Sequence, residues 1–231
     1  MIQRARATPA VNMSDELRVS LKRMQSAGEE LANSISHGIG LCAALIGAPI
    51  LLLEAHRSSP GFFLGTVIFA VTLSMLYLGS TLYHAWPQTR GKCVLRTLDH
   101  SAIFLLIAGT YTPFTLGPLR GLWGSAILAV VWALAIFGVI LKATRGASRH
   151  PKLGMTLYLG TGWLALIAVR PMMLAIPSAA LFWLVAGGVI YTTGVLFFVN
   201  QRLRYSHFIW HLFVLAGSSC HFLAVLSCCG T

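Results

Sequence analysis

The chain has 231 residues, of which 56% are hydrophobic and only 10% are charged. A soluble domain carries about 25% charged residues, so this sequence has too little polar surface to coat a soluble globule of its size. The 17 Lys and Arg outnumber the six Asp and Glu, and the formal net charge is +11. Because the basic residues are scattered singly between long apolar runs, we expect no nucleic-acid partner. The five cysteines form no CxxC motif and indicate no disulfide framework.

Seven apolar runs are long enough to cross a membrane, since a spanning helix needs roughly 20 mostly apolar residues. Short breaks that contain proline, glycine, lysine or arginine separate these runs. The runs cover residues 33–55, 61–84, 97–117, 121–141, 153–171, 177–199 and 206–228. The sequence therefore predicts an all-α integral membrane protein, a seven-transmembrane helix bundle that forms one domain over residues 32–231.

Residues 1–31 are predicted to be a cytoplasmic N-terminal tail. Ser14 is a candidate N-cap for a short helix in the second half of this tail. Apolar side chains follow it near helical spacing, at Leu17, Leu21, Met24 and Leu31. A loosely ordered tail and an interfacial helix on the inner leaflet both fit this pattern, because basic residues attract anionic lipid.

The distribution of basic residues predicts how the bundle is oriented. With seven spans, 14 of the 17 Lys and Arg fall on the side of the N-terminus, and only Arg57, Arg120 and Arg170 fall on the other side. Cytoplasmic loops carry the excess of Lys and Arg in membrane proteins. We therefore expect the N-terminus in the cytoplasm, the C-terminus outside, and a multi-pass protein of the inner (plasma) membrane.

One carboxylate side chain, Asp99, is present between residue 55 and the C-terminus. Ionisable residues inside membrane spans are costly and mark functional sites by default. In the predicted topology Ser80, His84, Asp99, His207 and His211 all lie in the inner-leaflet half. His207 and His211 are spaced i, i+4 and share one helical face. Three imidazoles and a carboxylate from three helices are enough to build a metal site, and zinc favours histidine nitrogens.

Other polar residues near this depth leave alternatives open. Any single membrane histidine is more often a hydrogen-bonded packing residue than a ligand. Glu29 and Glu30 fit stabilisation of the first helix through its dipole, and contact between Glu30 and a histidine is the alternative. His37 faces the same end and, like Glu30, is a candidate outer residue of the site. His100 faces away from Asp99, and His221 lies in the outer half.

Four segments together resemble the hemolysin III family, the bacterial branch of the progestin and adipoQ receptor family. The resemblance runs in order from about residue 29 to residue 222. The segments are EELANSISHG (29–38), GSTLYH (79–84), LDHSAIFLLIAGTYTP (98–113) and HFIWH (207–211).

The resemblance implies a zinc ion near the cytoplasmic side, with His84, His207 and His211 as its ligands. It makes Asp99 the carboxylate that holds a zinc-bound water, and Ser80 a hydroxyl that orients a ligand or polarises the substrate. The wider superfamily includes alkaline ceramidases, which implies hydrolysis of lipid amides.

Three functions follow as hypotheses. The first is a zinc-dependent hydrolase that acts on a membrane lipid amide or ester, in membrane-lipid homeostasis. The second is a non-enzymatic membrane sensor in which zinc has a structural role. The third is a cytolysin or channel, against which the absence of a ring of charges argues. The sequence leaves the lipid substrate or ligand, catalysis itself and the oligomeric state open.

Overall fold

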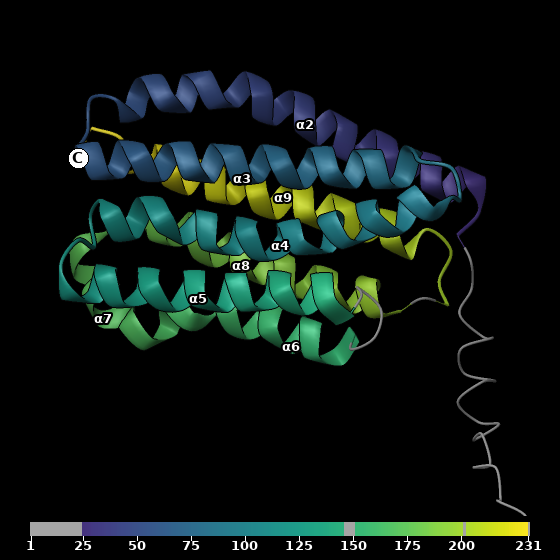
Figure 1. Cartoon of the computed structure of the whole chain (residues 1–231). Coiled ribbons are helices and arrows are strands. Elements are labelled where there is room, and N and C mark those ends of the chain that lie inside the picture. Colours follow the sequence, from purple (N-terminus) through teal and green to yellow (C-terminus); the bar gives the residue numbers. More distant parts are fainter. Residues whose placement is uncertain (1–24, 146–150, 201, 231) are drawn as a thin grey trace, which may run out of the picture.

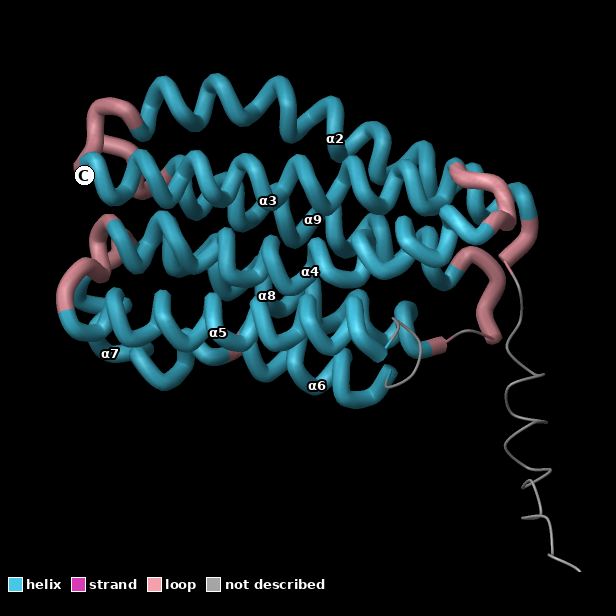
Figure 2. The backbone as a smooth tube through the Cα atoms, in the orientation of Figure 1, coloured by secondary structure: helices cyan, strands magenta, loops and turns pink. Residues whose placement is uncertain are grey.

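The computed structural model describes residues 25–145, 151–200 and 202–230, and all regular structure in these residues is helical (Figure 2). One short element, η1, is a 3-10 helix, and the others are α-helices. The elements in chain order are α2 (Ala27–Ala55), α3 (Pro60–Ala85), α4 (Arg90–Leu116), α5 (Leu122–Arg145), α6 (Pro151–Gly162), η1 (Leu164–Ala168), α7 (Val169–Ala175), α8 (Ser178–Val199) and α9 (Ser206–Leu226).

Seven helical stretches of the described residues are long and apolar enough to cross a membrane, which confirms the predicted seven-helix membrane fold. Six of these stretches each lie in a single helix, namely α2, α3, α4, α5, α8 and α9. The remaining span, Leu153–Ala175, is formed by α6, η1 and α7 together. The helices lie side by side in one bundle, with α9 packed against both α8 and α2 (Figure 1). The start of α2 and the C-terminal end of α9 therefore lie at opposite ends of the bundle.

The first helix begins earlier than the apolar run that predicts it. α2 starts at Ala27, because Ser26 and Glu29 form a reciprocal capping box at its N-terminus. Its first two turns are polar, so a hydropathy run starting at residue 33 excludes them. The sequence places residues 27–31 in the tail, but in the structure they are helical. The rest of the candidate interfacial helix, up to residue 24, lies outside the described residues.

The fifth span is broken, whereas the sequence predicts one continuous helix. α6 ends at Gly162, η1 follows, and α7 then continues to Ala175. The Tyr111 hydroxyl of α4 accepts from the Ala165 N–H at 3.0 Å and lies 2.8 Å from the Gly162 carbonyl, so it pairs backbone groups that the break leaves without helical partners. Pro171, predicted to end the span, lies in the first turn of α7, where its missing N–H costs no helical hydrogen bond.

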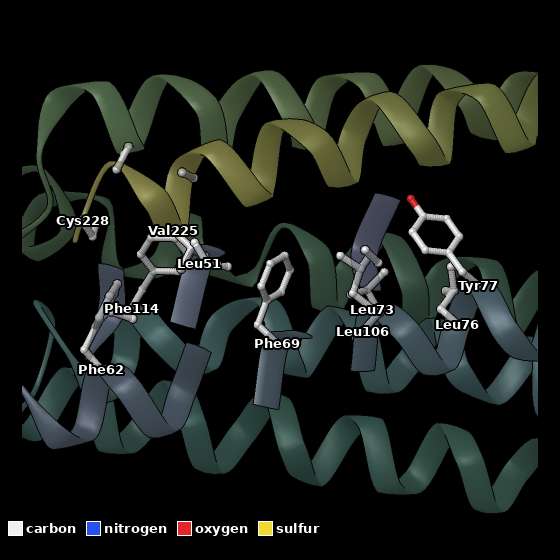
Figure 3. Close-up of a cluster of buried hydrophobic side chains, with 14 of the residues drawn as sticks. Leu51, Phe62, Phe69, Leu73, Leu76, Tyr77, Leu106, Phe114, Val225 and Cys228 are labelled. Atoms are coloured by element: carbon white, nitrogen blue, oxygen red, sulfur yellow. The ribbon is translucent and has the colours of Figure 1, made fainter. Parts of the chain in front are cut away.

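Large apolar side chains fill the interior between α2, α3, α4 and α9 (Figure 3). Phe69 and Leu51 are fully buried in this cluster, and Leu76 and Tyr77 lie at the part of α3 that approaches the end where α2 begins. Many isoleucine, leucine and valine side chains on the outer faces are exposed, as expected of a bundle that faces lipid. The core thus holds α3, α4 and α9 in fixed positions beside one another.

Candidate metal centre

Three histidines from two helices meet at the end of the bundle where α2 begins. His84 lies in the last turn of α3, and His207 and His211 lie in the first two turns of α9. One ring nitrogen from each lies within 4.8 Å of the others. The ring centroids of His207 and His211 are 4.7 Å apart, as the i, i+4 spacing on one helical face predicts. These three nitrogens could hold a metal ion.

A hydrogen bond with Glu30 of α2, which Lys92 of α4 in turn contacts, fixes the orientation of the His84 ring. Its Nδ1 lies 2.6 Å from Glu30 Oε2, and the other carboxylate oxygen of Glu30 accepts a hydrogen bond from Lys92 Nζ at 2.9 Å. The Lys92 ammonium also donates to the Trp86 carbonyl at 3.1 Å. His84 Nε2 is buried and has no hydrogen-bond partner among the described residues. A buried nitrogen without a partner is costly unless a ligand occupies it.

The His211 ring is held in a similar way by α2. Its Nδ1 lies 3.2 Å from the Asn33 carbonyl and 3.1 Å from the Ser36 hydroxyl oxygen. Since Ser36 already donates to the Asn33 carbonyl, the imidazole N–H can donate to either oxygen. Metal-binding histidines typically donate their second ring N–H to a carboxylate or a backbone carbonyl, and His84 and His211 have these two kinds of partner. The donor set therefore fits a transition metal that prefers imidazole ligands.

Ser80 and Asp99 lie next to the histidine cluster. Ser80 is one turn before His84 on α3 and is completely buried. Asp99, on α4, is also buried, and its carboxylate lies near the Ser80 hydroxyl, which has no hydrogen-bond partner among the described residues. α3 and α4 lie beside each other here, since a Cβ added at Gly79 would lie 3.9 Å from the Asp99 Cα, in ordinary van der Waals contact. The structure thus places a hydroxyl and a carboxylate at the edge of the cluster.

The candidate outer residues differ in how they contact the cluster. Glu30 contacts His84 directly, which is the alternative to a purely helix-dipole role. His37 stacks flat on His211, with centroids 3.6 Å apart and an interplanar angle of 8°, but it is not one of the three clustered residues. Glu29 instead accepts from the Tyr205 N–H at 2.7 Å and joins the start of α2 to the segment before α9.

Sequence reasoning missed three contributors to this site: Lys92, the Asn33 carbonyl and the Ser36 hydroxyl. Lys92 falls in a break between two apolar runs of the sequence, whereas in the structure it lies in the first turn of α4 and is buried. The sequence did carry a signal for the contribution of α2, because polar residues recur on one face of this helix at helical spacing. They are Glu29, Glu30, Asn33, Ser36 and His37. This signal could not specify which helix the face contacts.

An apolar cavity of about 610 Å³ begins one helical turn away from the site. Its lining includes Leu76, four residues before Ser80; Ile103, four residues after Asp99; and Val214, three residues after His211. It continues along α4 and α8 and along the broken span α6–η1–α7. Residues four positions apart in a helix lie on the same face, about 6 Å along its axis. The cavity thus extends from the cluster into the apolar interior.

The sequence matches known proteins over nearly the whole described region. A family model described as "Haemolysin-III related" matches residues 25–222. The chain is 41% identical over 202 residues to "Hemolysin-3 homolog" of Bacillus subtilis (strain 168), covering 87% of this chain and 94% of that protein. It is 40% identical over 203 residues to "Hemolysin-3" of Bacillus cereus, covering 87% and 92%.

A human protein is similar at a lower level. The chain is 28% identical over 213 residues to "Monocyte to macrophage differentiation factor" of Homo sapiens, covering 85% of this chain and 83% of that protein. The family model covers the three histidines of the cluster. The chain is therefore a multi-pass membrane protein that belongs to the hemolysin III family.

Proposed function

We propose that the protein is a zinc-dependent hydrolase of a membrane lipid amide or ester and acts in membrane-lipid homeostasis. The observation that carries the proposal is the cluster of His84, His207 and His211, one helical turn from a large apolar cavity. Zinc suits three imidazole ligands, and a catalytic zinc site keeps its fourth position open. The buried hydroxyl and carboxylate beside the cluster supply polar groups for the reaction.

A zinc ion bound by three histidines supplies Lewis acidity and lowers the pKa of water toward neutrality. Asp99 is placed to orient the attacking water and to accept its proton on a carboxylate oxygen. The Ser80 hydroxyl is placed to donate a hydrogen bond to the oxygen of the substrate carbonyl, where negative charge develops. Glu30 holds the His84 ring in one tautomer by accepting from its Nδ1–H.

The cavity supports a lipid as the substrate. Its walls are almost entirely apolar, and the amide or ester group of a lipid lies at the polar end of its hydrocarbon chain. With the chain in the cavity, that group lies near the cluster, because the cavity begins next to Leu76, Ile103 and Val214. Burial of a hydrocarbon chain contributes about 0.8 kcal/mol per CH₂ group to binding.

Metal content and lipid turnover of the purified protein test this proposal together. We expect wild type to contain about one zinc per chain and His211→Ala to contain much less, because the variant removes one of three ligands. Wild type should turn over a fluorescent lipid amide, and Asp99→Ala should lower the rate by about 100-fold or more while it retains zinc. Full activity of Asp99→Ala would contradict the hydrolase, and near-zero zinc in both wild type and His211→Ala would contradict the metal site.

A non-enzymatic sensor with a structural zinc is the second candidate. The observation that favours it is the contact of Glu30 with both His84 and Lys92, which links α2, α3 and α4 at the cluster. A metal held by α3 and α9 would complete a clamp on these helices. In this case zinc removal lowers the melting temperature, and no lipid amide or ester is turned over by the zinc-loaded protein.

A further inference from the structure

The carboxylate of Glu29 contacts the N-terminal ends of two helices, α2 and α9. Its Oε2 accepts from the Ser26 N–H at 2.9 Å and from the Ser26 hydroxyl at 3.0 Å, in the capping box of α2. Its Oε1 accepts from the N–H of Tyr205, the N-cap residue of α9, at 2.7 Å. Because the positive ends of both helix dipoles meet here, one buried carboxylate stabilises both helices. Glu29 thus joins α9 to α2 at the end of the bundle that holds the histidine cluster.

The backbone of Tyr205 is left-handed, with a φ of 58° and a ψ of 16°. Among the described residues it is the one non-glycine residue with a positive φ. A bulky residue adopts this conformation only where the surrounding structure determines it. The contacts that do so come from α2. They are the hydrogen bond to Glu29 and the close approach of the Tyr205 hydroxyl to Gly28, where an added Cβ would lie 3.3 Å from that oxygen.

His207 follows Tyr205 by two residues, and its ring is held differently from the other two rings of the cluster. His84 and His211 each have a hydrogen bond to α2. The His207 ring has none among the described residues, and its contacts are with the rings of His84, His211 and Phe198. The position of this ring therefore depends on where the backbone of α9 begins, which is the point that Glu29 holds.

We propose that Glu29 is a positioning residue of the metal centre, and that it places His207 by holding the left-handed backbone of Tyr205. A change of φ at Tyr205 moves the start of α9 and His207 with it. The rings of His84 and His211 keep their own hydrogen bonds to α2. The proposal rests on the proposed function only in taking the cluster to bind zinc, and it is independent of the lipid and of the reaction.

Cobalt(II) bound to the purified protein tests this role. Zinc has no d–d spectrum, whereas the visible absorption of cobalt(II) in the same ligands reports the coordination geometry. Glu29→Gln has a single side-chain oxygen, which cannot accept from both Ser26 and Tyr205 as the two carboxylate oxygens do. We expect this variant to bind zinc about tenfold more weakly, and its cobalt spectrum to differ from that of wild type.

Ser26→Ala is the matched control, because it removes the hydroxyl half of the capping box and leaves the hydrogen bond between Glu29 and Tyr205 in place. It should lower the melting temperature while the cobalt spectrum and the zinc affinity stay as in wild type. Equal changes in Ser26→Ala and Glu29→Gln would overturn the proposal, since the capping of α2 would then account for both.

Two substitutions of Tyr205 test the left-handed backbone without touching Glu29. Both remove the ring and keep the N–H, but glycine adopts a positive φ readily and a β-branched residue does not. Tyr205→Gly should therefore keep the cobalt spectrum of wild type, and Tyr205→Val should change it as Glu29→Gln does. Equal spectra for Tyr205→Gly and Tyr205→Val would overturn the proposal, because the backbone of Tyr205 would then have no part in placing the ligand.

The same measurements separate this proposal from the proposed hydrolase. A wild-type protein that binds neither zinc nor cobalt would remove both. Metal binding with a spectrum and an affinity unchanged in Glu29→Gln would overturn the positioning role alone. A changed spectrum in Glu29→Gln, together with no turnover of a lipid amide by zinc-loaded wild type, would support the positioning role and contradict the hydrolase.

Discussion

Glu30 is the residue that connects the metal centre to the surrounding helices. Its carboxylate lies in α2, contacts the Nδ1 of His84 on α3 at 2.6 Å, and accepts from Lys92 on α4 at 2.9 Å. A carboxylate that accepts from a histidine N–H fixes the tautomer and raises the basicity of the opposite ring nitrogen. The Lys92 ammonium in turn fixes the position of the carboxylate. The negative charge of Glu30 therefore matters for metal affinity as well as for packing.

Glu30→Gln should weaken zinc binding by about 10-fold to 100-fold, because a neutral amide orients and polarises the His84 ring less well. Competition with a fluorescent zinc chelator measures this change. Glu54→Gln is the matched control, since Glu54 is a half-exposed glutamate at the other end of α2, 3.7 Å from Arg57. Equal zinc affinities for Glu30→Gln and wild type would contradict the role of Glu30.

At the scale of elements, the break in the fifth span depends on one hydroxyl from α4. Tyr111 lies 3.0 Å from the Thr161 carbonyl and 2.8 Å from the Gly162 carbonyl, and it accepts from the Ala165 N–H. Trp163 adds a hydrogen bond to Thr192 of α8 at 3.0 Å. Broken helices are tolerated in membranes only where other groups satisfy the freed backbone. The shape of the cavity wall formed by η1 therefore follows from Tyr111.

Tyr111→Phe should loosen the segment between α6 and α7 while the rest of the bundle is retained. The loss of these hydrogen bonds costs about 1–3 kcal/mol locally, because buried backbone groups are left without a partner. Hydrogen exchange over residues 161–168 should become faster, and exchange in α3 should stay as in wild type. Unchanged exchange over residues 161–168 would show that other contacts hold the break.

The sequence predicted the seven spans well because long apolar runs are a direct consequence of lipid contact. It could not predict the break after Gly162, because the residues from Leu164 to Val169 are as apolar as a continuous helix and glycine is common in membrane helices. The clustering of His84 with His207 and His211 could be predicted from the sequence. The topology places the three residues at the same depth in the membrane, and the i, i+4 spacing places His207 and His211 on one face of their helix. The contact of Lys92 with Glu30 depends on how α2 and α4 pack, which no local pattern encodes.

At the scale of the molecule, the distribution of basic residues predicts orientation in the membrane. The metal centre lies at the end of the bundle where α2 begins, and the sequence places 14 of 17 Lys and Arg on that side. We therefore expect the metal centre to face the cytoplasm. A phosphatase reporter that is active only outside the membrane should be active when fused after residue 231 and inactive when fused in the loop between α3 and α4. The opposite pattern would reverse the proposed orientation.

Metal binding should also stabilise the bundle as a whole, because its ligands come from two helices, α3 and α9, that are far apart in the sequence. α3 and α9 each pack against α2, and a metal at the cluster would join them directly. A ligand that binds only the folded state at 100 times its Kd adds about 2.7 kcal/mol of stability. For a chain of this size that raises the melting temperature by about 5–10 °C. Thermal unfolding in detergent with added zinc or chelator measures the shift.

Two variants provide the control for this measurement. His211→Ala should lose the zinc-dependent shift in melting temperature, whereas His56→Ala, in an exposed loop, should keep it. A zinc-dependent shift of equal size in His211→Ala would place the stabilising metal elsewhere.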